Sequence, residues 1–169
     1  KRHEVIIPWA PGYGKSTLPD SLAGIDDVSY LYLDLLDRLN LTGVKVMGFS
    51  VGGWIAAEIA TKNCGRLDRL VLVDTVGAKF GGPFDRDIED IYYLPTEEVR
   101  RLKFHDGARD PLADMSTLSR KRATAVARHR ETTAKFCWEP YFHNPSRKNR
   151  LGRIQIETLV VWGAKDGFV

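Results

Sequence analysis

Apolar residues gather in short runs at four places along the chain, and these runs predict the strands of a sheet. The runs lie at residues 5–9, 44–48, 70–74 and 158–162. Each has the length of a strand and leads into glycine, proline or other turn-forming residues. The run at 70–74 is continuously apolar up to its final aspartate, as expected for a strand that is covered on both faces.

Between these runs the apolar residues recur at helical spacing. Those from Ile25 to Leu39 are three, four or seven positions apart, which predicts an amphipathic helix over about residues 26–40. Residues 51–63 are rich in alanine, glycine and isoleucine and predict a second helix that packs closely on a sheet. Short strands that alternate with helices need crossover connections, so the sequence predicts an α/β protein with a mostly parallel sheet flanked by helices.

The middle of the chain follows a different pattern. From about residue 80 to residue 153 it is polar and basic with interspersed aromatic residues, and it has no run that resembles a strand. A helical insertion between two strands of one sheet is therefore expected. The predicted organisation is a first core part over residues 1–79, a helical insertion over 80–153, and a return to the core over 154–169.

Composition agrees with an ordinary globular domain. Of the 169 residues, 43% are hydrophobic and 28% are charged, which excludes a disordered chain, a collagen and a disulfide scaffold. The only two cysteines, Cys64 and Cys137, lie far apart, which favours a reducing, cytoplasmic location. No apolar run approaches the roughly 18 residues of a membrane span, and no signal peptide is recognisable at the start, so no membrane partner is expected.

Basic residues concentrate in one part of the predicted insertion. Residues 120–153 contain ten lysines and arginines against two acidic residues, including the run from Arg120 to Arg122 and, further on, Arg128 and Arg130. Such a stretch can bind nucleic acid. A solvated helix face has the same composition and no nucleic-acid motif accompanies it, so we favour the solvated face and expect no nucleic-acid partner.

The most informative pattern is Gly-Phe-Ser-Val-Gly at residues 48–52, which matches G-x-S-x-G. It lies between a predicted strand and a predicted helix, where glycines permit a tight turn that exposes the Ser50 hydroxyl. The backbone N–H of Val51 then points to the same place, where it can stabilise an oxyanion. The alternative is that the glycines merely make a close turn in a parallel sheet.

With this motif the chain resembles the α/β-hydrolase family. Two further patterns carry the resemblance: Pro-Gly-Tyr-Gly-Lys-Ser at 11–16, similar to the family's G-x-G-x-S loop, and Val-Val-Trp-Gly-Ala-Lys-Asp at 160–166. The insertion at 80–153 resembles the helical cap that many members carry. Trp9 and Glu157 depart from the residues common in relatives at those positions.

The resemblance implies a catalytic triad of serine, acid and histidine in that order along the chain. Ser50 matches the nucleophile and Asp166 the acid, with Asp74 as a weaker substitute for the acid. A serine at position 50 argues against relatives with an aspartate nucleophile, such as haloalkane dehalogenases and epoxide hydrolases.

The histidine expected after Asp166 is absent, because the sequence ends at Val169. The histidines present are His3, His105, His129 and His143, none of which follows the acid. The family's first strands and its second oxyanion donor are missing as well. We therefore expect the chain to be truncated at both ends and inactive by itself.

The resemblance implies hydrolysis of an ester or a similar acyl or C–C bond in a small hydrophobic substrate. The alternative is a catalytically inactive binding module with the same fold. Histidine and cysteine do not cluster at ligand spacings, and no dinucleotide fingerprint is present, so neither a metal nor a cofactor is expected. The sequence leaves the substrate and the oligomeric state open.

Overall fold

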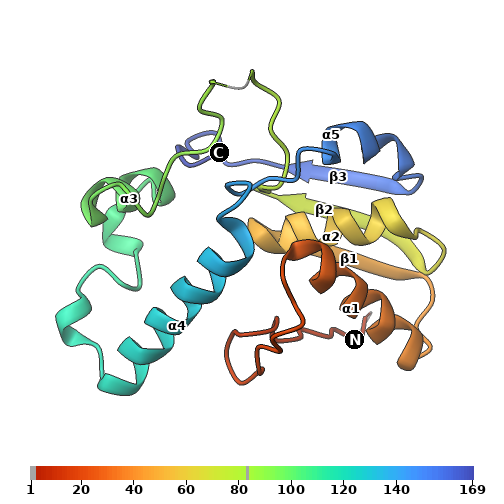
Figure 1. Cartoon of the computed structure of the whole chain (residues 1–169), viewed down its shortest axis with the longest axis horizontal. Coiled ribbons are helices and arrows are strands. Elements are labelled where there is room, and N and C mark those ends of the chain that lie inside the picture. The colour runs from red at the N-terminus through yellow and green to blue at the C-terminus, as the bar shows by residue number, and fades with distance from the viewer. Residues whose placement is uncertain (1–2, 83) are drawn as a thin grey trace.

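A parallel three-stranded sheet forms the centre of the molecule (Figure 1). The computed structural model describes residues 3–82 and 84–169. Strand β1 runs over Val44–Phe49, β2 over Leu67–Val73 and β3 over Glu157–Val161, in the spatial order β1-β2-β3. Both strand pairs are parallel, so the predicted α/β class and three of the four predicted strands are confirmed.

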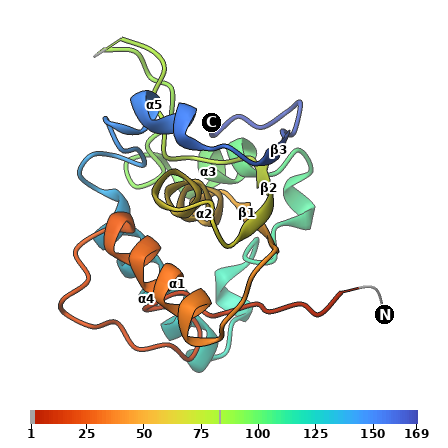
Figure 2. The ribbon, with the colours of Figure 1, turned by 90° about the vertical axis from the view of Figure 1, so that its right-hand side faces the viewer.

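Two helices cover one face of the sheet: α1, Ile25–Arg38, precedes β1, and α2, Val51–Lys62, connects β1 to β2. Helix α1 packs on α2, and α2 packs on β1 and β2. The Asp27 carboxylate accepts the N–H groups of Ala23 and Gly24 and so satisfies donors at the start of α1. Figure 2 shows α1, α2 and the short helix α5, Arg147–Arg150, on the same side of the sheet.

The two faces of the sheet differ in burial, and the strand at 70–74, expected to be covered on both faces, is only half-buried on one of them, at Val71 and Val73. On the face under α2, Leu70 and Leu72 are buried. The register places the opposite side chains of neighbouring strands in line on the other face, where Met47, Phe49 and Leu159 are each about 60% exposed. In the described residues, no helix packs on that face of β1.

The predicted strand at residues 5–9 is also wrong. This stretch is not a strand, and Val5, Ile7 and Trp9 are 74%, 86% and 61% exposed. An apolar run becomes a strand only when a neighbouring edge accepts its backbone hydrogen bonds. The loop that follows packs instead against α4, Arg120–Cys137, and the run does not pair with β1.

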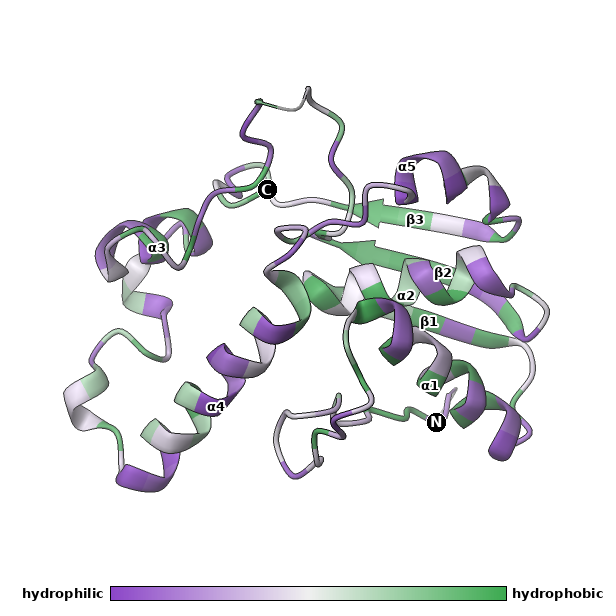
Figure 3. Ribbon diagram, viewed as in Figure 1, coloured by the Kyte–Doolittle hydropathy of each residue, from purple (hydrophilic) through white to green (hydrophobic). Residues whose placement is uncertain are grey.

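Residues 80–153 are here termed the helical segment. They contain α3 at Thr96–Lys103, α4, α5 and three short 3₁₀ turns at Gly107–Arg109, Met115–Thr117 and Leu151–Arg153. Helices α3 and α4 lie toward the carboxyl ends of the strands, whereas α5 lies beside β3 (Figure 1). As expected, the described part of the segment has no strand, apart from an isolated bridge between Gly77 and His143. Figure 3 shows α3, α4 and α5 as largely hydrophilic and the strands as largely hydrophobic.

Candidate functional site

Ser50 occupies a strained turn between β1 and α2. Its backbone has φ 48° and ψ −118°, a conformation that a non-glycine residue rarely adopts. Its N–H donates to the Val73 carbonyl over 3.0 Å, and its carbonyl accepts the Trp54 N–H over 3.1 Å. The residue therefore ends one element and begins the next, which is the strand-to-helix context that the motif predicts.

Close backbone packing explains why this turn contains glycines. A Cβ on Gly48 would lie 2.2 Å from the Gly52 carbonyl oxygen, and one on Gly53 would lie 2.4 Å from Thr75 Oγ1. At Gly52 a Cβ would meet nothing within 4 Å. The elbow thus depends on the first glycine of the motif and on Gly53, which lies one position outside it.

Val51 is the first residue of α2. Its N–H is among the amides at the start of a helix that have no acceptor within that helix, and the helix dipole makes this end partly positive. This position suits an N–H that stabilises negative charge forming beside Ser50.

Asp166 lies in a turn just after β3. Its N–H donates to the Gly163 carbonyl over 2.9 Å, and its carboxylate accepts the N–H groups of Phe168 and Val169 over 2.8 and 3.3 Å. The side chain is half-buried. A carboxylate held by two backbone donors is well oriented to receive a further hydrogen bond.

Asp74 joins the two neighbouring strand ends at this edge. It follows β2 with φ 43°, and its N–H donates to the Val161 carbonyl over 3.0 Å. Its carboxylate accepts the Gly163 N–H over 2.7 Å, so it fixes the start of the Asp166 turn. The parallel register therefore brings Ser50, Asp74 and the turn containing Asp166 to the same edge of the sheet.

Three of the four histidines have other partners. His129 Nε2 accepts the Gly14 N–H over 3.0 Å, and His143 Nδ1 lies 2.8 Å from the Tyr141 carbonyl oxygen. His105 Nε2 lies 3.2 Å from Lys165 Nζ, immediately before Asp166 in sequence. Within residues 3–82 and 84–169, no histidine hydrogen-bonds to Ser50 or Asp166.

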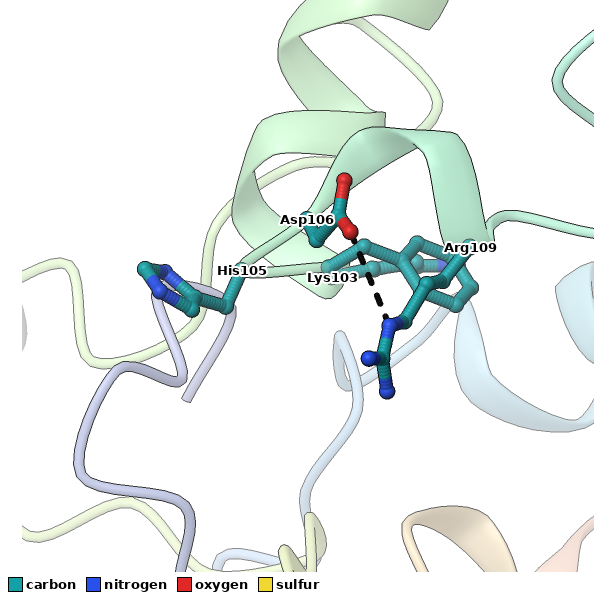
Figure 4. Close-up of a pocket in the computed structure, with 5 residues that line it drawn as sticks. Lys103, His105, Asp106 and Arg109 are labelled. Carbon is teal, nitrogen blue, oxygen red and sulfur yellow. Dashed lines mark ion pairs between the residues drawn. The ribbon is translucent and has the colours of Figure 1, made fainter.

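A hollow of about 520 Å³ lies beside α3 and is lined by Lys103, Phe104, His105, Asp106 and Arg109. Figure 4 shows the Asp106–Arg109 ion pair, 3.6 Å long, and His105 turned away from it. The Gly167 N–H donates to the Leu102 carbonyl, so the end of α3 contacts the Asp166 turn. No sequence motif indicated this contact, because it depends on how the helical segment docks.

The loop at residues 11–16 packs against α4. Arg128 donates to the carbonyls of Gly12 and Gly14, and Tyr13 OH lies 2.6 Å from Thr133 Oγ1. Gly12 has φ +82°, and a Cβ there would lie 2.6 Å from Thr132 Cγ2. Arg128, Arg147 and Arg153 of the basic stretch thus each donate a hydrogen bond within the chain, while the expectation about nucleic acid stays untested.

Comparison with known families gives a match over the whole chain. The model described as "alpha/beta hydrolase fold" matches residues 1–169. The chain belongs to the α/β-hydrolase family. Its predicted resemblance and fold class are therefore confirmed.

Curated relatives of this α/β-hydrolase are named as hydrolases of 2-hydroxy-6-oxo compounds. A 2-hydroxy-6-oxononadienedioate/2-hydroxy-6-oxononatrienedioate hydrolase of Paraburkholderia xenovorans is 30% identical over 80% of this chain and 50% of its own length. A 2-hydroxy-6-oxo-6-phenylhexa-2,4-dienoate hydrolase of Comamonas testosteroni is 26% identical over 99% of this chain and 62% of its own length. The chain thus spans between half and two thirds of these relatives.

Solved structures agree on the fold. A bromoperoxidase from Bacillus anthracis superposes with a TM-score of 0.65 at 21% identity, over 94% of this chain and 62% of that chain. A membrane phospholipase A described as a bacterial virulence factor gives a TM-score of 0.69 at 19% identity, over 95% of this chain and 54% of that chain. In the described part of this chain, no helix is both long and apolar enough to cross a membrane.

Proposed function

We propose that this chain is part of a serine hydrolase that cleaves a C–C or ester bond next to a carbonyl group in a small hydrophobic substrate. The strained conformation of Ser50 between β1 and α2 is the observation that carries the proposal. The substrates named for the curated relatives contain keto and carboxylate groups but no ester bond, which supports the C–C reaction. We further propose that the helical segment, residues 80–153, forms a cap over the carboxyl edge of the sheet.

In the proposed ester reaction, Ser50 Oγ attacks the substrate carbonyl carbon while a histidine from outside this chain takes its proton. Negative charge on the carbonyl oxygen is stabilised by the Val51 N–H. The C–O bond then breaks, and the leaving alkoxide receives the proton from the histidine. Water, deprotonated by the same histidine, releases the acid product from Ser50.

Asp166 is the proposed partner of that histidine. Its carboxylate is held in place by the N–H groups of Phe168 and Val169, so it can fix the imidazole tautomer and stabilise the imidazolium. Asp74 serves as a positioning residue, because its carboxylate anchors the turn at Gly163.

The test uses the complete protein encoded by the reading frame that contains this chain. A dienoate substrate of the kind named for the relatives, monitored by loss of its absorbance, is compared with a p-nitrophenyl ester. Ser50→Ala is expected to lower kcat by about 10⁶-fold and Asp166→Asn by about 10⁴-fold. Activity of Ser50→Ala within tenfold of the parent would refute the nucleophile.

The 169-residue chain by itself is expected to show little turnover, since a serine without a base is a weak nucleophile. A fluorophosphonate probe, with Ser50→Ala as the control, measures its reactivity. Rapid labelling that depends on Ser50 would show that a base inside this chain activates it.

A binding module with the same fold is the second candidate. It is favoured by one observation: the hydrogen-bond partners of His105, His129 and His143 are Lys165, Gly14 and Tyr141, and none of them is Ser50. Slow labelling in both the chain and the complete reading frame, together with saturable binding of the dienoate, would support this candidate over the enzyme.

A further inference from the structure

A second cavity, of about 530 Å³, lies beside β2 and β3 on the side of the sheet that Leu72 faces, and it opens to solvent along β3, where Val160 is 57% exposed. Its walls come from β2, β3, the 3₁₀ turn at Leu151–Arg153 and the stretch that follows β2. Most of the lining is aliphatic or aromatic, including Leu72, Val76, Ile154 and Trp162. Ser50 does not line it, although Thr75 both lines it and lies 3.4 Å from the Ser50 carbonyl oxygen. A cavity of this size and lining suits a small apolar molecule.

One charged side chain in this cavity is buried without a matching anion. Arg147 is 2% exposed and donates through Nη1 to the Val76 carbonyl over 3.1 Å. Its Nε is buried and has no hydrogen-bond partner. In the part of the chain that the structure describes, no carboxylate forms an ion pair with it. A buried guanidinium donor in this state is costly unless a ligand or water accepts from it.

Glu58, the buried acid whose charge acts on Arg147, is already engaged. The two carboxylate oxygens of Glu58 accept from Trp54, Asn144 and Lys62. Burial lowers the pKa of Arg147 to about 10, and Glu58 partly opposes that effect. The guanidinium is therefore charged at neutral pH, and the Glu58 carboxylate that could compensate it accepts hydrogen bonds from other donors.

The backbone leaves room for this guanidinium. Gly77 has φ +102°, and a Cβ there would lie 2.1 Å from Arg147 Nη1. A side chain at position 77 would thus displace Arg147, and the left-handed backbone itself favours glycine. The fold therefore provides a space for the Arg147 guanidinium beside Gly77.

The other donors of the cavity wall are occupied. The hydroxyls of Thr75 and Thr158 donate to the carbonyls of Val76 and Ile156, and the Trp162 indole donates to the Val169 carbonyl. Among the described lining side chains, Arg147 is therefore the one with a buried donor, Nε, that has no hydrogen-bond partner.

We propose that this cavity binds a monocarboxylate with an apolar tail, the carboxylate on Arg147 and the tail against the aliphatic wall. Asp87, the acidic residue of the lining, argues against a second carboxylate on the ligand. The N–H groups of Gly81 and Phe80 donate to it and hold its pKa below the usual value, so it stays charged. The proposal does not depend on Ser50 chemistry.

Isothermal titration of the 169-residue chain with octanoate and with octanamide tests the proposal. The wild-type chain is expected to bind octanoate about 10- to 100-fold more tightly than octanamide, because a hydrogen bond to a buried charge is strong. Equal affinities, or no binding of octanoate at all, would overturn it, the latter meaning that a water satisfies Arg147. This comparison uses the wild-type chain alone, so it does not depend on whether a variant folds.

Variants then locate the site. Arg147→Met, which preserves side-chain volume, is expected to weaken octanoate binding about 10- to 100-fold and to change octanamide binding less than twofold. Arg150→Met removes an exposed arginine of the same helix α5 and should change neither. Ser50→Ala should also bind octanoate normally, which separates this site from the proposed hydrolase. Unchanged octanoate affinity in Arg147→Met would overturn the assignment.

Discussion

The two loops that meet at the carboxyl edge of the sheet are held in different ways. The Ser50 elbow is fixed by backbone packed against backbone, with Gly48 against the Gly52 carbonyl. The Asp166 turn is held by two carboxylates: that of Asp74 accepts the Gly163 N–H, and that of Asp166 accepts the Phe168 N–H. Steric constraints of the first kind leave no tolerance for an added atom, whereas hydrogen bonds of the second kind are individually worth about 1 kcal/mol. The elbow is therefore expected to fail abruptly and the turn gradually.

Gly48→Ala should have the largest effect. Its new Cβ would lie 2.2 Å from the Gly52 carbonyl oxygen, which a small shift cannot relieve because both atoms belong to packed elements. We expect the free energy of unfolding to fall by about 3 kcal/mol or more. Urea denaturation followed by circular dichroism measures this. A loss below about 1 kcal/mol would show that the elbow is less tightly packed than described.

Gly53→Ala should have an intermediate effect, because the clash is with a side chain. Thr75 can move away at the cost of its hydrogen bonds, and we expect a loss of about 1–3 kcal/mol. In a double-mutant cycle with Thr75→Ala, the two changes should couple by at least about 0.5 kcal/mol. Strict additivity would place the clash elsewhere.

Asp74→Ala tests the second loop. It removes the acceptor of the Gly163 N–H and places an alanine at φ 43°, for an expected loss of about 1–2 kcal/mol. Asp74→Asn keeps an oxygen acceptor and tolerates this backbone conformation, so it should cost less than about 0.5 kcal/mol. Amide hydrogen exchange at Gly163 should quicken in the alanine variant alone. Equal exchange in both variants would mean that the carboxylate does not hold the turn.

Gly52→Ala should have the smallest effect, and of opposite sign. A Cβ there meets nothing within 4 Å, and alanine favours the helical backbone of α2. We expect a gain of up to about 1 kcal/mol. The contrast with Gly48→Ala, measured under the same conditions, separates packing from glycine's general effect on the unfolded chain.

The sequence predicted best the parts that local pattern determines. Residues 44–62 carry their strand, turn and helix signals within the segment itself, and the structure has β1, the elbow and α2 there. Residues 5–9 carry an equally strong strand signal, yet whether they pair depends on an edge that another part of the chain must provide.

The same distinction applies to the site. Ser50 and Asp166 were visible as motif residues, and the contacts of Asp74 with the Asp166 turn follow from the strand order. Arg147 carried no signal, because an arginine in a basic stretch gives no sign that it is buried. Its environment arises only when α5 docks beside the segment after β2.

The hydrogen bond between Asp74 and Gly163 joins residues 89 positions apart, and the whole helical segment lies between them. Closing such a loop costs conformational entropy that grows only with the logarithm of its length, about 0.6 kcal/mol for each doubling. Residues can therefore be added to or removed from the segment at little cost to the sheet, provided that its two ends still return to adjacent strands. The same architecture is expected to slow folding, because β2 and β3 are far apart in the sequence and must come together before they can pair.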